Sequence, residues 1–242
     1  LLRSSDEMKK KRNARDLRKK LLKIYEILNG YFGDLHWWPA DHPFEMMVGA
    51  ILTQNTAWTN VEKAIEALRR NRLLSPAALF HIPEDELAEI IRPSGYYHLK
   101  AQRLKSFVRF FLKEFSGSDS AMKAEPLPIL RDKLLDVRGI GPETADSILL
   151  YACQKPVFVC DAYTKRILLR HGLIGEEADY LAIQALFMNH LPPDVSLFGQ
   201  YHALIVKTGK VFCRKEPRCS ACPLAVLRTA KRPSSRRKTT QS

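Results

Sequence analysis

The sequence predicts an all-α protein, because its apolar residues recur at helical spacing and no segment alternates apolar and polar residues as a half-buried strand does. The clearest case is a set of residues that fall on one face of a helix that Asn29-Gly30 would end, namely Leu17, Leu21, Ile24 and Leu28. With 242 residues, the chain is long enough to bury a sizeable core in one large or two small domains.

Helix boundaries can be placed along the chain in order. Thr59 stands three residues before Glu62, which is the spacing of a capping box, and Pro76 and Pro83 occupy positions typical of a helix start. Ser116-Gly117 ends a basic amphipathic segment. For four of the expected helices only the start is predicted, near residues 16, 59, 76 and 84. The other expected helices cover 44–52, 101–115, 127–137, 142–151, 162–170, 180–189 and 198–208.

The net charge of +13 is concentrated at the two ends of the chain. Residues 1–20 contain nine Lys/Arg and three Asp/Glu, and residues 229–242 contain five Lys/Arg and no acid. Such ends either bind nucleic acid through counterion release or are simply solvated, and charge alone does not decide between these readings. We expect disordered basic tails over 1–15 and 229–242.

No apolar run approaches the roughly 20 residues of a membrane helix, and the N-terminal segment lacks the apolar stretch of a secretory signal. We therefore expect no membrane partner and a cytoplasmic location. Because the sequence begins with Leu1 rather than Met, an absent leader stays open.

A glycine-rich hairpin is the first candidate functional feature. The predicted helices 127–137 and 142–151 are separated only by Arg138-Gly139-Ile140-Gly141. The glycines permit a tight turn, and Pro142 suits the first turn of the next helix. Exposed amides of such a hairpin can hold a phosphate, although an ordinary helix corner with a glycine cap explains the same residues.

Asp161 is the second candidate. It follows the apolar run 156–160 and directly precedes a predicted helix. Aspartate is a favoured N-cap, which explains the residue without any function. The same position would also point a carboxylate outward from a packed wall, where it could take part in chemistry.

Together, the hairpin with Thr144 after it and Asp161 resemble the helix-hairpin-helix, Gly/Pro-rich, Asp superfamily of DNA glycosylases, to which endonuclease III belongs. The resemblance extends from about Leu17 to Cys222. It implies a six-helix barrel over 36–153, a second helical domain from 16–35 plus 154–228, and a cleft for DNA and base between them. It also implies a monomer, a nucleoid-associated location, and a partner that is double-stranded DNA with a damaged base.

By this resemblance, the hairpin residues contact DNA, namely Gly139, Ile140, Gly141 and Thr144. Segment 49–56 resembles a family motif in which Gln54 would fill the gap left by an extruded nucleotide. Segment 92–101 resembles another, in which Lys100 would reach a phosphate. A polar residue in a helix-end loop and a solvated helix start are the respective alternatives.

The resemblance also implies a mechanism. A base inside a duplex must be rotated out of the stack before chemistry, and cleavage of its N-glycosidic bond builds positive charge on the sugar. Asp161 would stabilise that charge, activate water, or both. Family members that also nick the strand carry a lysine where this chain has Glu143, so we expect a monofunctional, hydrolytic enzyme. Lys165, one turn after Asp161, is the alternative amine.

The chain's three tryptophans indicate the base. Trp37, Trp38 and the adjacent Pro39, together with Trp58, resemble a subgroup that excises alkylated purines such as 3-methyladenine. Aromatic faces attract a cationic methylated base. Three alternatives stay open: aromatic residues that only pack the core, an endonuclease III-like enzyme for oxidised pyrimidines with AP-lyase activity, and a non-catalytic helix-hairpin-helix DNA-binding protein.

The last motif is a cysteine loop. Cys213, Cys219 and Cys222 resemble the 4Fe–4S loop of many of these enzymes, but no cysteine follows Cys222 to complete the four ligands. The resemblance implies a cluster with a non-cysteine ligand, a degenerate site, or another metal. A metal-binding interaction protein would explain these cysteines but not the hairpin and Asp161. Cys153 and Cys160 are expected in the core.

Overall fold

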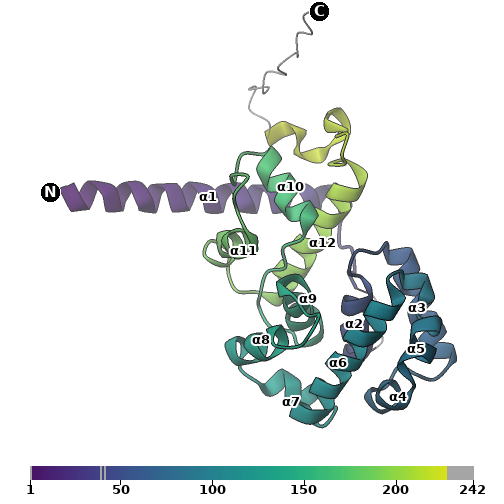
Figure 1. Ribbon diagram of the computed structural model, residues 1–242. Coiled ribbons are helices and arrows are strands. Elements are labelled where there is room, and N and C mark those ends of the chain that lie inside the picture. The colour runs from purple at the N-terminus through teal and green to yellow at the C-terminus, as the bar shows by residue number, and fades with distance from the viewer. Residues whose placement is uncertain (1, 39, 41, 228–242) are drawn as a thin grey trace, which may run out of the picture.

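The computed structural model describes residues 2–38, 40 and 42–227, and the secondary structure in this part of the chain is entirely helical (Figure 1). The all-α prediction is confirmed for these residues. The α-helices are α1 (Leu2–Phe32), α2 (Pro43–Leu52), α3 (Trp58–Arg70), α4 (Pro76–His81), α5 (Glu84–Ile90), α6 (Tyr97–Phe115), α7 (Asp119–Ala124), α8 (Leu127–Leu135), α9 (Pro142–Ser147), α10 (Ala162–Arg170), α11 (Tyr180–Met188) and α12 (Val195–Val211). The short turns are η1 (Arg92–Ser94), η2 (Ile148–Ala152, π-helical), η3 (Cys219–Ala221) and η4 (Pro223–Leu227).

Helix α1 is longer than the sequence pattern predicted. The expected disorder over 1–15 is wrong for residues 2–15, which form the first half of α1. This segment contains many good helix formers, and neither proline nor glycine interrupts it before Gly30. The second half of α1 is anchored by buried Leu21, Ile24 and Leu28. The other predicted tail, 229–242, lies outside the described residues.

Helices α2 to α6 share an apolar core at one end of the molecule (Figure 1). Every residue of α2 after Pro43 is buried. Phe44 stacks on Phe111 of α6, which stacks on Phe107, with ring centroids 5.8 and 5.9 Å apart. This packing fixes the end of α2, where the turn that carries Gln54 begins.

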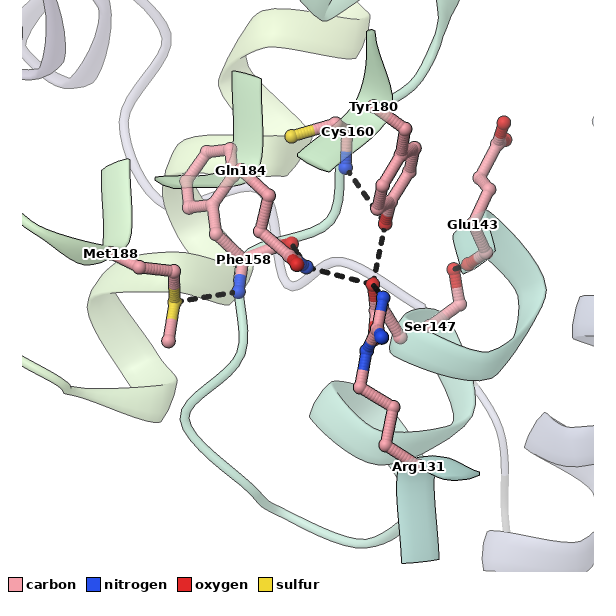
Figure 2. Close-up of polar contacts among 9 residues, drawn as sticks. Arg131, Glu143, Ser147, Phe158, Cys160, Tyr180, Gln184 and Met188 are labelled. Atoms are coloured by element: carbon pink, nitrogen blue, oxygen red, sulfur yellow. Dashed lines mark hydrogen bonds and ion pairs between the residues drawn. The ribbon is translucent and has the colours of Figure 1, made fainter. Parts of the chain in front are cut away.

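A buried carboxylate ties α8 and α9 to α11. Asp146 is fully buried and accepts hydrogen bonds from Arg131 Nε at 2.8 Å and Nη2 at 3.1 Å. The Tyr180 hydroxyl and Gln184 Nε2 donate to the same carboxylate at 2.8 and 2.7 Å. Figure 2 shows the side chains of Arg131, Tyr180 and Gln184 converging on one point. The cluster therefore holds the hairpin between α8 and α9 in a fixed position relative to α11.

Helix α12 packs against α1, α10 and η2, so its side chains reach both the start of α10 and the end of the hairpin helix. The proposed division into domains at residues 36 and 153 stays a prediction. None of the helices in the described part of the chain combines the length and the apolarity that crossing a membrane requires.

Candidate active site

The hairpin has the backbone geometry that its glycines suggested. Gly139 has φ +89°, a left-handed conformation that favours glycine, and a β-carbon there would collide with the Arg103 side chain. Ile140 is buried and anchors the turn. Gly141 is exposed, is the N-cap of α9, and has open space where a side chain would stand. Gly141 is thus accessible to a ligand, and the contact of the hairpin with DNA stays a prediction.

Gln54 lies directly against this hairpin. Its Nε2 donates to the Gly139 carbonyl at 3.0 Å and to Thr144 Oγ1 at 2.9 Å, and its Oε1 accepts from Arg103. The structure therefore brings together Gln54, Gly139 and Thr144, three of the predicted DNA-contacting residues. Thr144 is itself buried, and its hydroxyl supports Gln54, while its contact with DNA stays a prediction. No sequence pattern pointed to Arg103.

Lys100 is a buried structural residue, and its expected contact with a phosphate is wrong. Only 1% of Lys100 is exposed, and Nζ donates to the Leu52 carbonyl, Thr56 Oγ1 and the Ser94 carbonyl at 2.8, 2.6 and 2.6 Å. Burial, with a smaller effect of Arg103, lowers its pKa to about 8. The lysine thus ties the turn after α2 to η1.

Asp161 caps α10 with one oxygen and leaves the other available. Oδ1 accepts from Thr164 N at 2.7 Å and from Thr164 Oγ1 at 2.8 Å, and the Asp161 backbone N donates to Thr164 Oγ1 at 3.4 Å, which completes a capping box. Oδ2 faces Nε2 of His202, 3.9 Å away. The N-cap reading and the functional reading of Asp161 are therefore compatible, because each uses a different oxygen.

Two residues that the sequence pattern did not single out lie behind Asp161. His202 of α12 is buried, and its Nδ1 is 2.6 Å from the Tyr151 hydroxyl of η2. Burial lowers the pKa of His202; Asp161 opposes that shift and Lys210 adds to it. Burial and Asp161 raise the pKa of Tyr151 well above its usual value. At neutral pH this pair is a neutral imidazole and a protonated phenol.

Trp37 and Trp38 are placed on either side of this pair. Trp37 contacts His202 edge-to-face at a centroid distance of 6.4 Å, and Lys210 Nζ lies 5.7 Å from its ring centre. The buried Trp37 Nε1 has no hydrogen-bond partner among the described residues. Trp38 lies against Tyr151 at 5.2 Å. The backbone of Trp38 has φ +66°, a strained conformation of the kind that occurs at functional sites.

Trp58 lies further from the carboxylate. Its ring contacts the edge of Trp38 at 5.3 Å, and its Nε1 donates to Glu62 at 2.8 Å. A cavity of about 280 Å³ is lined by residues of the Trp38 loop, α2 and α3, including Trp38, Trp58, Glu45 and Arg69. Of the predicted pocket residues, Trp37 thus contacts His202, Trp38 lies between Tyr151 and Trp58, and Trp58 lines the cavity. Pro39 lies outside the described residues.

Glu143 occupies the first turn of α9 and extends away from the Asp146 cluster (Figure 2). Although it is exposed to solvent, the surrounding protein and the Asp161 carboxylate raise its pKa to about 7. Lys165, the alternative amine, donates to the Ala178 carbonyl at 2.7 Å and is held there.

The cysteine loop does not have the geometry of a metal centre. Cys213, Cys219 and Cys222 line a small cavity of about 30 Å³ beside α10. Arg170 Nη1 donates a hydrogen bond to Cys213 Sγ at 3.2 Å, so this sulfur already has a cationic partner. No group of three His, Cys, Asp or Glu side chains in the described residues could hold a metal ion. The described residues, as arranged, therefore do not fit a 4Fe–4S cluster, and a cluster with an incomplete ligand set stays a prediction. Cys153 and Cys160 are buried, as expected.

The fold and the site define a class of protein. A family model described as "HhH-GPD superfamily base excision DNA repair protein" matches residues 48–193, more than half of the chain. The chain belongs to this superfamily and is a DNA glycosylase, which confirms the resemblance seen in the sequence.

The chain is also similar to individual proteins. The chain is 47% identical over 205 residues to the "Putative DNA repair glycosylase" of Methanocaldococcus jannaschii, which covers 84% of this chain and 93% of the relative. It is 32% identical to an H. pylori 3-methyladenine DNA glycosylase solved with 1,N6-ethenoadenine, with a TM-score of 0.65 and coverage of 81% and 97%. A trapped endonuclease III–DNA covalent intermediate matches with a TM-score of 0.75 at 22% identity, covering 87% and 94%, and supports the fold.

Proposed function

We propose that this DNA glycosylase releases an alkylated purine such as 3-methyladenine by hydrolysis, without cutting the strand. The observation that carries the proposal is that Trp37 and Trp38 contact His202 and Tyr151, the pair that lies behind Asp161. A methylated purine that has become cationic would gain from these ring faces and from the nearby carboxylate. The H. pylori 3-methyladenine glycosylase, solved with a modified adenine, supports this choice.

Asp161 would act through Oδ2. A flipped nucleotide places its sugar near this oxygen, where the carboxylate stabilises the cationic transition state and accepts a proton from the attacking water. A cationic base leaves without first being protonated, so a single carboxylate suffices for it. This requirement separates alkylated purines from neutral lesions, which are poorer leaving groups.

The absence of lyase chemistry follows from the available amines. Glu143 stands at the position of the family's nucleophilic lysine, and Lys165 is held by the Ala178 carbonyl. Lys210 is the remaining amine close to Trp37 and His202, and it is exposed. If strand cutting occurs, Lys210 is the residue to test first.

Base release from matched duplexes tests the proposal. Duplexes that contain 3-methyladenine or thymine glycol at the same position are incubated with excess enzyme, and the free base is quantified. We expect release of 3-methyladenine and little release of thymine glycol. Release of thymine glycol alone would reverse the choice of base. Lesion-independent DNA binding without any release would favour the non-catalytic alternative.

Borohydride trapping tests the lyase assignment. We expect no covalent protein–DNA adduct after reduction in the presence of substrate, because no nucleophilic lysine occupies the expected position. An adduct with the wild type that disappears in Lys210→Ala would assign the amine and refute monofunctional hydrolysis. Lys165→Ala serves as the matched control. The monomeric state and the nucleoid-associated location stay predictions.

A further inference from the structure

The contacts of His202, which lies behind Asp161, favour one tautomer of its imidazole. The Tyr151 hydroxyl carries one proton and lies 2.6 Å from His202 Nδ1 but 3.3 Å from the Gly199 carbonyl. The Asp161 carboxylate decides the direction of the shorter contact, because a lone pair on Nε2 would face its negative charge. A neutral imidazole has one proton, which therefore resides on Nε2. Nδ1 is then the acceptor, and Tyr151 donates to it.

The separation of Nε2 and Asp161 Oδ2 suits a bridging water. At 3.9 Å the two atoms are too far apart for a direct hydrogen bond. A water oxygen about 2.8 Å from each atom would lie beside the line that joins them, where it accepts from Nε2–H and donates to Oδ2. Since Oδ1 is engaged by Thr164, Oδ2 is the only oxygen of Asp161 that can take this water.

We propose that His202 is a second catalytic residue, which holds the attacking water together with Asp161, and that Tyr151 positions His202. The proposal rests on the proposed hydrolysis. As the C1′–N bond breaks, its electron pair leaves with the base, and the water oxygen forms a bond to C1′. The water proton passes to Asp161 Oδ2 and then to solvent. His202 keeps its proton throughout, and its hydrogen bond to the water oxygen orients the remaining lone pair of the water towards C1′.

A pair of substitutions separates catalysis from packing. The amide nitrogen of His202→Gln can occupy the position of Nε2, whereas that of His202→Asn reaches only the position of Nδ1. We expect the single-turnover rate of 3-methyladenine release to fall about 100-fold in His202→Asn and about tenfold or less in His202→Gln. Binding to a duplex with a stable abasic analogue should be unchanged in both. His190→Gln, at a histidine bonded to the Leu186 carbonyl, is the matched control.

The split between rate and binding gives a readout that a packing defect would not produce. A packing defect would lower the unfolding free energy and the affinity for the abasic duplex together with the rate, whereas loss of the Nε2–H donor should lower only the rate. Lys210 and Glu143 also lie near this pair, and both variants retain them. Equal rates of base release for the two variants would overturn the proposal.

The tautomer can be measured without any substrate. Nitrogen-15 NMR of labelled protein should show His202 as the neutral Nε2–H form at pH 7, with its signals assigned by their loss in His202→Gln. Tyr151→Phe should mix the two tautomers and slow base release. An Nδ1–H or doubly protonated His202 in the wild type would overturn the proposal. If the wild type releases no base, the proposed function fails, and the NMR result still decides how His202 is oriented.

Discussion

Asp161 shows how one side chain can serve both folding and chemistry. Its Oδ1 caps α10, and its Oδ2 faces His202. Asparagine is as good an N-cap as aspartate, but it carries no negative charge. We therefore expect Asp161→Asn to keep the stability and the duplex binding of the wild type while base release falls by about 10²–10⁴-fold, as measured in single-turnover assays and by binding to an abasic duplex.

The control for this prediction is Asp161→Ala, which removes both roles. We expect the same loss of base release together with a loss of about 1 kcal/mol of unfolding free energy, because the cap of α10 disappears. Base release by Asp161→Asn within tenfold of the wild type would refute the assignment of Asp161.

The raised pKa of Glu143 predicts how the stability of the protein depends on pH. Desolvation by the surrounding protein and the Asp161 carboxylate raise its pKa from the ordinary 4.5 to about 7, so the folded chain holds this proton more tightly than the unfolded chain does. Below pH 4.5 both states are protonated, and as the pH rises towards 7 the folded state loses stability relative to the unfolded state. We expect the thermal midpoint of Glu143→Gln, relative to the wild type, to rise between pH 4.5 and pH 8.

Solvent around the exposed Glu143 makes this effect modest, so its sign is the test. In an Asp161→Asn background the same comparison should give a smaller rise, because one cause of the raised pKa is gone. A difference in thermal midpoint that is constant with pH would show that Glu143 titrates normally.

At the scale of elements, the strongly patterned helices could be predicted, and the weakly patterned ones could not. The segments 44–52, 162–170 and 180–189 agree with α2, α10 and α11 to within one residue at either end. The short α7 was missed because six residues give too little periodicity, although Ser118 caps it with a 3.2 Å hydrogen bond from Ala121 N. Sequence also did not reveal that the charged start of α1 is helical.

The site was predictable only where local sequence decides geometry. The turn at Gly139 and the cap at Asp161 are set by adjacent residues. Lys100 was misassigned because its three acceptors come from residues 6 to 48 positions away, which no local pattern reveals. His202 was missed for the same reason, since 41 residues separate it from Asp161 and 51 from Tyr151.

The Asp146 cluster leads to a prediction for the hairpin elements. Asp146 is fully buried, and removal of one member of a buried ion pair leaves the other charge uncompensated. We expect Asp146→Ala to lose about 3–5 kcal/mol of unfolding free energy in urea titrations. The double variant with Arg131→Met should recover part of that loss. A loss below about 1 kcal/mol would mean that the cluster does not hold α8, α9 and α11 together.

At the scale of the whole molecule, the positive charge belongs to the periphery. Between the two basic ends, the chain is close to neutral, as its residue counts show. Helix α1 extends from the rest of the fold with its N-terminus at the far end (Figure 1). Several of its described basic residues are exposed, namely Arg12, Arg15, Arg18, Lys19 and Lys20. A helix holds these charges in an ordered row, which a disordered tail would not do.

This arrangement predicts that α1 contributes to DNA affinity but not to catalysis. For every phosphate that the protein no longer neutralises, the slope of log K against log salt should become shallower by about 0.9. We expect the triple substitution Arg12→Gln, Arg15→Gln and Lys19→Gln to weaken duplex binding at low salt and to flatten this slope. Base release at saturating enzyme should be unchanged, because these side chains are exposed on α1 and take no part in the contacts of α1 with α12 or in the site around Asp161.

The matched control removes the same charge from the other end of the molecule, with Lys63→Gln and Arg70→Gln on α3 and Lys113→Gln on α6, all exposed residues. Both triple variants lower the net charge by three, so a general electrostatic effect would flatten the salt dependence equally in both. A greater effect of the α1 substitutions would locate phosphate contacts on that helix. Equal slopes would mean that the row of charges on α1 is only solvated, and that the duplex is held by the hairpin and its surroundings.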